Sequence, residues 1–206
     1  MAGHFCFPSA AMVLLIFVCF VGRAIGGVSF STLPRTLAVT ASPKQGQVLM
    51  AGVDKLKVSW GLNQTEKEGT DEAYKKVKVK LCYAPVSQQN RGWRKTEDDL
   101  KKDKTCQFTI TTQPYTKNPN PSSFEYILER DLPSASYFVR VYALDGNDKE
   151  VAYGQTTDAQ KTTNLFQVIA ITGRHASLDI AAACFSAFSV VSLIFFFVKE
   201  KRKAKK

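Results

Sequence analysis

Cysteines are the residues of this 206-residue chain whose type and spacing most clearly suggest chemistry. Cys6 and Cys19 lie in an apolar N-terminal block and Cys184 in an apolar C-terminal block, so Cys82 and Cys106 are the two left between them. An even pair of thiols in an oxidising compartment typically forms a disulfide. In the loop-entropy model, a bridge closing a loop of this length stabilises a fold by roughly 3 kcal/mol. The expected chemistry is therefore a structural cross-link.

Residue combinations typical of catalysis are missing from the sequence. His175 is the one histidine beyond the N-terminal block, and no His, Cys and carboxylate residues share metal-ligand spacing. There is no G-x-S-x-G elbow, P-loop or dinucleotide fingerprint. Adjacent acids such as Asp98 and Asp99 lie in a charged run, which is usually solvated surface. We predict no catalytic residues, no metal site, no cofactor and no enzymatic activity.

The two apolar blocks have the properties of targeting segments. Residues 10–21 are too few to span a bilayer and precede the small residues Ala24 and Gly26, which is typical of a signal peptide over 1–26. Residues 180–198 carry no charge, and as a helix they would extend about 28 Å, close to the hydrocarbon thickness. We predict an extracytoplasmic domain at 27–178, a transmembrane helix at 179–198 and a basic cytoplasmic tail at 199–206.

The distribution of charge predicts the orientation of the chain. The formal net charge is +10, and about half of it lies in the C-terminal tail. Basic flanks remain cytoplasmic, so a cleaved signal peptide and this tail agree on a single-pass type I topology. Nucleic acid binding is disfavoured by that topology. Asn63 begins the acceptable glycosylation sequon Asn-Gln-Thr of the predicted external domain.

The segment between the apolar blocks shows the period-two pattern of β-strands. Apolar residues alternate with polar or charged ones around residues 55–60, 76–81, 108–111 and 124–129. A turn signal at residues 145–147 separates two further strands. No stretch has a convincing amphipathic helical pattern. The sequence predicts an all-β antiparallel sandwich.

One local motif makes the fold prediction more specific. The run LPSASYFVRV at 132–141 resembles the corner of fibronectin type III and immunoglobulin-like domains, in which a tyrosine hydroxyl bonds back to the corner backbone. Tyr137 would be that tyrosine, unless it is simply another strand aromatic, and Trp60 would lie in the core. Cys82 shares its strand face with lysines whereas Cys106 shares phase with Phe108, so we expect the disulfide near strand ends.

The predicted transmembrane helix carries small residues at Ala182, Ser186 and Ser189, near one face. Small residues let helices approach closely in a membrane, so this face is a candidate for packing against a partner helix. Small residues are also common in any spanning helix.

Taken alone, these features leave a binding role: an adhesion or receptor module with an extracellular ligand, or an accessory subunit. Four runs decide between them, at 42–49 (SPKQGQVL), 77–85 (VKVKLCYAP), 91–106 (RGWRKTEDDLKKDKTC) and 137–155. In these runs the chain resembles the plant high-affinity nitrate transporter-activating protein family, from residue 42 through the tail. The resemblance implies a subunit that binds a high-affinity nitrate transporter of the major facilitator class. It also implies support for delivery of that transporter to the plasma membrane and for its stability there.

The charged run at 91–104 is the predicted partner contact. Its types, with Trp93 flanked by Arg91 and Arg94 and followed by Asp99 and Asp103, include those enriched at interface hot spots. Arg94 and Asp103 match charged positions of the family's central motif. The alternative is a solvated charged loop. We expect a hetero-oligomer with the transporter at the plasma membrane, and no direct binding of nitrate by this chain.

Overall fold

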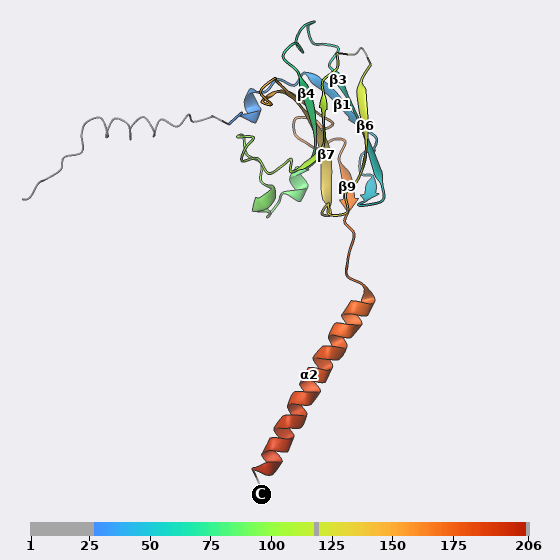
Figure 1. Cartoon of the computed structure of the whole chain (residues 1–206), viewed down its shortest axis with the longest axis vertical. Helices are drawn as coiled ribbons and strands as arrows, with labels where there is room; N and C mark the ends of the chain where they lie inside the picture. Colours follow the sequence, from blue (N-terminus) through green and yellow to red (C-terminus); the bar gives the residue numbers. More distant parts are fainter. Residues whose placement is uncertain (1–26, 118–119, 205–206) are drawn as a thin grey trace, which may run out of the picture.

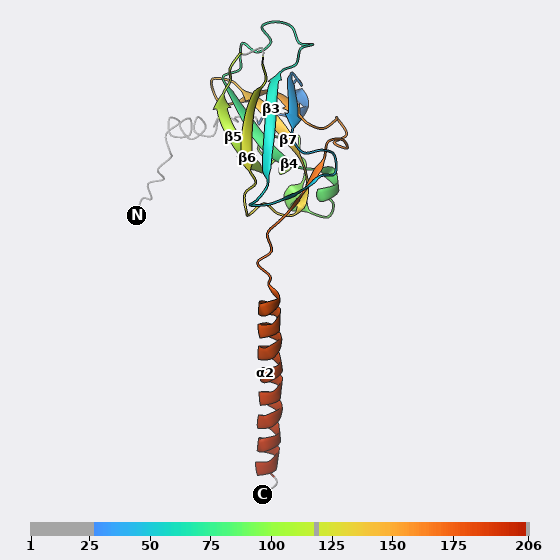
Figure 2. The same cartoon turned by 90° about the vertical axis from the view of Figure 1, so that its right-hand side faces the viewer.

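The computed structural model describes residues 27–117 and 120–204, so the expected signal peptide lies outside the described residues. A β-rich domain is followed by a short connecting segment and one long helix, α2 (Figure 1). A view at right angles shows the same separation of domain and helix (Figure 2).

The strands of the described domain are mostly short. They are β1 (Leu37–Ala41), β2 (Val48–Met50), β3 (Lys55–Leu62), β4 (Lys76–Tyr83), β5 (Phe108–Pro114), β6 (Ser122–Ile127), β7 (Ala135–Leu144), β8 (Glu150–Gln155) and β9 (Phe166–Ile169). Three 3₁₀ turns accompany them: η1 (Phe30–Thr32), η2 (Pro85–Ser87) and η3 (Gly92–Arg94).

Two sheets pack face to face. The smaller sheet has the order β1-β3-β6, and the larger has the order β2-β9-β7-β4-β5 with β8 also paired to β7. At one side β8 approaches β1 so closely that a Cβ on Gly154 would overlap with the carbonyl of Leu37. Glycine is therefore required where the two sheets meet.

The alternating residues of the sequence form the core between these sheets. Val58 and Trp60 of β3 are buried against Val79 of β4 and Val141 of β7, while the residues between them point outward. Alternation places successive side chains on opposite faces, so one apolar stripe per strand suffices for a sandwich. The predicted all-β, immunoglobulin-like class and the core position of Trp60 are confirmed.

The predicted tyrosine corner is present. The hydroxyl of Tyr137 donates a hydrogen bond of 2.7 Å to the carbonyl oxygen of Pro133, and the ring is completely buried. The ring also stacks on that of Tyr83, with centroids 5.1 Å apart. Burial raises the pKa of Tyr137 far above its usual range, so the hydroxyl keeps the proton that it donates. The corner fixes the start of β7.

Pairing between strands departs from the prediction at one edge. β7 and β8 form the expected antiparallel hairpin, but β2 pairs with β9 in parallel, with Met50 opposite Ile169. The larger sheet is therefore mixed instead of purely antiparallel. The sequence pattern records which face of a strand is buried and not the direction of its neighbour, so this pair was not foreseeable from alternation.

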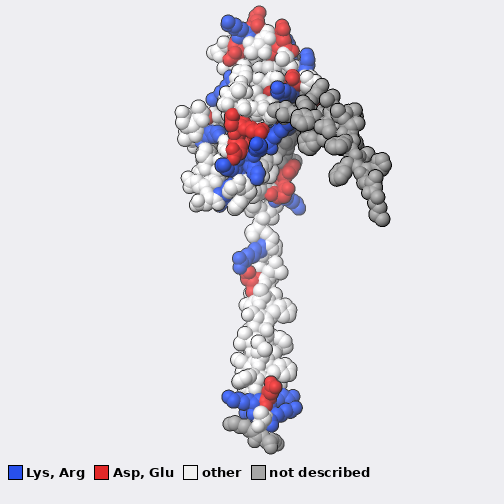
Figure 3. Space-filling view, turned by 90° about the vertical axis from the view of Figure 1, so that its left-hand side faces the viewer, with Lys and Arg blue, Asp and Glu red and all other residues white. Residues whose placement is uncertain are grey.

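The C-terminal helix is longer than the apolar run that predicted it. α2 spans Ala176–Lys203 and is the one helix of the described residues long and apolar enough to cross a membrane. A space-filling view shows charged side chains at its two ends and none along its middle (Figure 3). The extension past residue 198 consists of four basic residues and Glu200, which continue the helix with no proline or glycine to stop it.

Tyr137→Phe should lower the free energy of unfolding by about 1–3 kcal/mol, because the carbonyl of Pro133 would lose its buried partner. Urea denaturation of the full-length protein in detergent, followed by intrinsic fluorescence, measures the change. Tyr153→Phe offers a comparison at a half-buried ring whose hydroxyl has no hydrogen bond to the corner. Equal stability of Tyr137→Phe and wild type would show that the corner bond contributes nothing.

Candidate partner-binding site

The predicted disulfide joins Cys82, near the end of β4, to Cys106, just before β5. The two half-cystines lie on the outer face of the larger sheet, packed with Phe138 and Leu165 in a small second cluster. Both the pairing and its place near strand ends agree with the expectation. The bond closes residues 83–105 into a loop, which we call the bridged segment.

The bridged segment is tied to the tyrosine corner through Arg94. The guanidinium of Arg94 lies over the ring of Tyr83, 4.1 Å from its centroid, and Tyr83 in turn stacks on Tyr137. Nη1 of Arg94 donates a hydrogen bond of 3.1 Å to the carbonyl oxygen of Ser87. The hydroxyl of Ser87 accepts a hydrogen bond from the backbone N–H of Ser136 at the start of β7. Arg94 thereby joins η2 and η3 to the sheet.

The structure places Arg94 inside the bridged segment and not on its surface. Only 6% of the residue is exposed, and its Nε is buried without a hydrogen-bond partner among the described residues. As a predicted partner contact, Arg94 would present its guanidinium to a carboxylate or to backbone carbonyls of the transporter. Burial over Tyr83 leaves it no surface for such a contact. Arg94 instead holds the backbone of the segment at Ser87 from its buried side. Its position in the sequence alone does not reveal this role.

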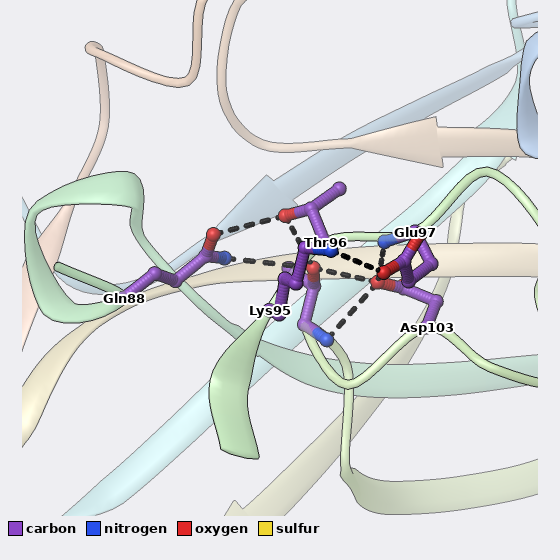
Figure 4. A network of polar contacts seen from close by, with 6 residues as sticks. Gln88, Lys95, Thr96, Glu97 and Asp103 are labelled. Atoms are coloured by element: carbon purple, nitrogen blue, oxygen red, sulfur yellow. Dashed lines mark hydrogen bonds and ion pairs between the residues drawn. The ribbon is translucent and has the colours of Figure 1, made fainter. Parts of the chain in front are cut away.

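Asp103 also bonds within the segment. Its Oδ1 accepts hydrogen bonds from the backbone N–H groups of Glu97 at 3.2 Å and Thr105 at 3.1 Å, and from the Thr105 hydroxyl at 2.7 Å. The network continues to Thr96 and Gln88, whose side chains lie near Thr105 (Figure 4). A single carboxylate therefore holds both ends of the 97–105 turn, with backbone N–H groups and Thr105 as partners instead of Arg94. A contact of Asp103 with the transporter stays a prediction.

The outer surface of the segment is formed by other residues. Trp93 is 61% exposed, and Arg91 beside it is exposed as well. Beyond them lies a hollow of ≈ 420 Å³ lined by lysines and two carboxylates, at Gly92, Lys95, Glu97, Lys101, Lys102, Asp103 and Lys104. Large exposed aromatic and arginine side chains beside a charged hollow fit recognition of another protein.

An N-terminal strap, residues 27–32, lies across the same segment. Leu100 N–H donates to the carbonyl of Val28, and Phe30 N–H donates to the carbonyl of Asp98 at 2.7 Å. The carboxylate of Asp98 accepts from the backbone N–H and the hydroxyl of Ser31, and these bonds lower the pKa of Asp98. Asp99 is half-buried beside the strap. Gly27 lies so close to its carboxylate that a Cβ on Gly27 would overlap with it.

Beneath the strap lies a buried arginine, Arg140 of β7, which is 1% exposed. Its guanidinium is 4.1 Å from the ring centroid of Phe30 and donates from Nε and Nη2 to Oε1 of Gln155. Nη1 donates to the hydroxyl of Tyr142 at 3.2 Å. No carboxylate of the described residues forms an ion pair with it. Aromatic faces and neutral acceptors stabilise this charge.

Two lysines near Arg140 have lowered pKa values. The pKa of Lys80 is lowered by burial and then by neighbouring Lys78, with a smaller contribution from Arg140. The pKa of Lys161 is lowered by burial and by Arg140.

The remaining predicted site residues are distributed over the molecule. Asn63 follows β3 directly, is half-buried, and its side-chain oxygen accepts a hydrogen bond of 3.4 Å from Thr65 N–H. Ala182, Ser186 and Ser189 lie on α2 and are exposed. Glycosylation and helix packing at these positions stay predictions. The described residues contain no group of three or more metal-ligating side chains.

Sequence reasoning missed Arg140, the strap and Asp98. Phe138, Arg140 and Tyr142 alternate with the core residues of β7, which marks them as one face. That pattern was a usable signal for a second covered surface. The strap gave no such signal, because its contacts lie 67 or more residues away in the chain.

Comparison with known proteins identifies the relatives of this chain. A family model described as "High-affinity nitrate transporter accessory, Ig-like domain" matches residues 30–173. The chain is 54% identical over 180 residues to "High-affinity nitrate transporter-activating protein 2.1" of Oryza sativa subsp. japonica, covering 87% of this chain and 84% of that protein. It is 55% identical over 172 residues to "High-affinity nitrate transporter 3.1" of Arabidopsis thaliana, covering 82% and 80% respectively.

Arg94→Ala should lower the free energy of unfolding by about 2 kcal/mol, because it removes a buried cation–π contact and a charged hydrogen bond. Lys104→Ala is the matched control in the same segment, and its exposed side chain should change stability by no more than about 0.5 kcal/mol. Urea denaturation of both full-length variants measures the difference. Indistinguishable variants would mean that Arg94 does not support the segment.

Proposed function

This chain belongs to the family of high-affinity nitrate transporter accessory proteins, and we propose that it is a non-catalytic subunit of such a transporter. In this role it binds the transporter as a hetero-oligomer and supports its delivery to the plasma membrane, its stability there and nitrate uptake. The observation that carries the proposal is the family match over the whole immunoglobulin-like domain, residues 30–173.

The architecture is compatible with an accessory role. A sandwich with one exposed charged segment can bind a protein partner, and a single helix can accompany a polytopic one in the membrane. The middle of α2 contains no Asp, Glu, Lys, Arg or His side chain to conduct an anion. We therefore assign transport to the partner. The alternative function, an adhesion or receptor module with an extracellular ligand, has no support from the relatives.

We propose a type I orientation in the plasma membrane, with the β-domain outside and the basic tail in the cytoplasm. Basic residues follow the apolar part of α2, and Asn63 lies in the domain that would face the secretory lumen. Asn63→Gln should then migrate faster than wild type on gels of protein expressed in plant cells. Identical mobility before and after glycosidase treatment of the wild type would contradict glycan attachment at Asn63.

The contact surface within this function is the outer face of the bridged segment, with Trp93 as the direct contact. Arg91 beside it is exposed, and it also donates a hydrogen bond of 3.3 Å to the carbonyl oxygen of Ser87. Arg94 and Asp103 act as positioning residues, because their side chains bond inside the segment. Asp99 has a similar place beneath the strap. The disulfide and these internal bonds pre-organise the surface, which reduces the ordering cost of binding.

Co-expression tests the function directly. In a cell without its own nitrate uptake, a high-affinity nitrate transporter and this protein together should give more labelled nitrate uptake and more surface transporter than the transporter alone. This protein alone should give background uptake, since its single helix has no charged path. An adhesion module would leave both quantities unchanged, and uptake by this chain alone would refute the accessory role.

Trp93→Ala should weaken co-purification of the transporter about tenfold while leaving the stability of this protein unchanged, because an exposed hot-spot aromatic contributes to binding and not to the core. Trp93→Phe keeps an aromatic face and serves as the conservative control. Binding is measured by titrating detergent-solubilised transporter against the full-length variants. If Trp93→Ala binds like wild type, the direct contact lies outside this part of the bridged segment.

A further inference from the structure

Exposed aliphatic side chains of the β-domain gather at one end. Among the described residues before α2, eight large hydrophobic residues are strongly exposed, and two of them, Val86 and Trp93, belong to the bridged segment. The other six form what we call the stalk patch: Val48 (48% exposed), Met50 (56%), Val53 (67%), Ile127 (58%), Ile169 (49%) and Ile171 (51%). Single exposed apolar residues are ordinary, whereas a cluster of this kind usually marks a contact surface.

Strand pairing brings the patch together. Parallel pairing of β2 with β9 sets Met50 opposite Ile169, while their neighbours Leu49 and Val168 point into the core. The outward residues of the two strands therefore lie side by side on one face.

The turn after β2 adds the rest of the patch. Ala51 N–H bonds to the carbonyl of Ile169, and Gly52 N–H bonds to the carbonyl of Leu128, one residue after the end of β6. Gly52 has a φ of 76°, and a Cβ there would lie 2.6 Å from Cγ of Arg130 and 2.9 Å from Cδ1 of Ile171. The backbones carrying Val53, Ile127 and Ile171 thus meet around this turn. The positive φ and the close side chain together require glycine at this position.

The connection to α2 restricts what can cover the patch. β9 ends at Ile169 and α2 begins at Ala176, so the tether of residues 170–175 reaches at most about 20 Å. Figure 1 shows β9 at the end of the domain from which the connecting segment leaves toward α2, and Figure 2 shows the same end from another side. With α2 in the membrane, the patch stays close to the outer membrane surface.

The residue types of the stalk patch favour a protein over the lipid headgroup layer as the surface that covers it. Segments that anchor at a membrane interface are typically rich in Trp and Tyr. The stalk patch contains three isoleucines, two valines and one methionine, with no aromatic residue among its exposed large hydrophobic side chains. Aliphatic and methionine side chains with a charged rim, here the exposed ion pair of Lys55 with Glu125, are typical of the buried centre of a protein interface.

We propose that the stalk patch is a second transporter-binding surface, seated on the extracellular loops of the polytopic partner close to the membrane. The inference rests on the proposed accessory function and adds to it a contact separate from the bridged segment. The two surfaces and α2 would hold one partner at three places, so that each contact raises the effective concentration of the others.

Site-specific photo-cross-linking identifies the occupant. A photoreactive phenylalanine derivative is placed at Met50 or at Ile169 of the full-length protein co-expressed with the transporter, and at Thr112 as the control. Thr112 is an exposed residue of β5, the other edge strand of the larger sheet. We expect a covalent adduct with the transporter from both patch positions and none from Thr112. Adducts with lipid alone, or with a second copy of this chain alone, would overturn the proposal.

Charge substitutions test the contribution of the patch to binding. Met50→Asp with Ile169→Asp should weaken co-purification of the transporter about tenfold, whereas Thr112→Asp should not. Since each changed residue is about half exposed or more, the disulfide and the fluorescence of the double variant should match wild type. If the wild type stimulates uptake and the double variant binds the transporter as tightly as the wild type, the proposed role of the stalk patch is refuted while the accessory function stands. Failure of wild type to bind or stimulate the transporter would refute the accessory function itself.

Discussion

The guanidinium of Arg140 is buried on the outer face of the larger sheet, and its need for partners explains why the N-terminal strap lies over this face. A buried cation without a carboxylate partner is costly unless aromatic faces and hydrogen-bond acceptors surround it. Phe30 arrives from the N-terminal strap and Gln155 from β8, while Tyr142 lies two residues along the same strand. The strap reaches this place by bonding to the bridged segment at Asp98. The environment of Arg140 therefore depends on segments from both ends of the domain sequence.

The bridged segment is held at a second point by the tyrosine corner. Tyr137 fixes the start of β7, Tyr83 stacks on it, and Arg94 lies over Tyr83. Asp103 closes the other half of the segment by accepting three hydrogen bonds. Charged residues that look like surface contacts thus act as internal supports. Their substitution would disturb a contact surface formed by their neighbours, since the backbone that presents it would move.

The domain divides its exposed features between two regions. The bridged segment presents an aromatic and cationic surface around Trp93, whereas the end next to α2 presents aliphatic side chains around Met50 and Ile169. The sandwich lies between them, and the tether at 170–175 limits the distance of the second region from α2. An accessory subunit of this design would recognise its partner through geometry as well as through residue types.

Sequence alone determined the features that depend on local pattern or on counting. Alternation identified β3 to β6, and the turn signal at 145–147 identified β7 and β8, whereas β1, β2 and β9 were not predicted. The run at 132–141 identified the corner, and the apolar block near the C-terminus identified α2. Elimination paired Cys82 with Cys106, because no other cysteine lies in the β-domain. These predictions succeed because each rests on periods or motifs contained within a few residues.

Tertiary structure decided which charged residues are exposed and which strands are neighbours. Arg94 and Trp93 are adjacent in sequence, yet one is 6% and the other 61% exposed, because only the folded segment places Tyr83 beneath the guanidinium. The parallel β2–β9 pair and the strap over Arg140 join residues far apart in the chain. Such contacts follow from the packing of the whole domain, which local propensity and side-chain period do not encode.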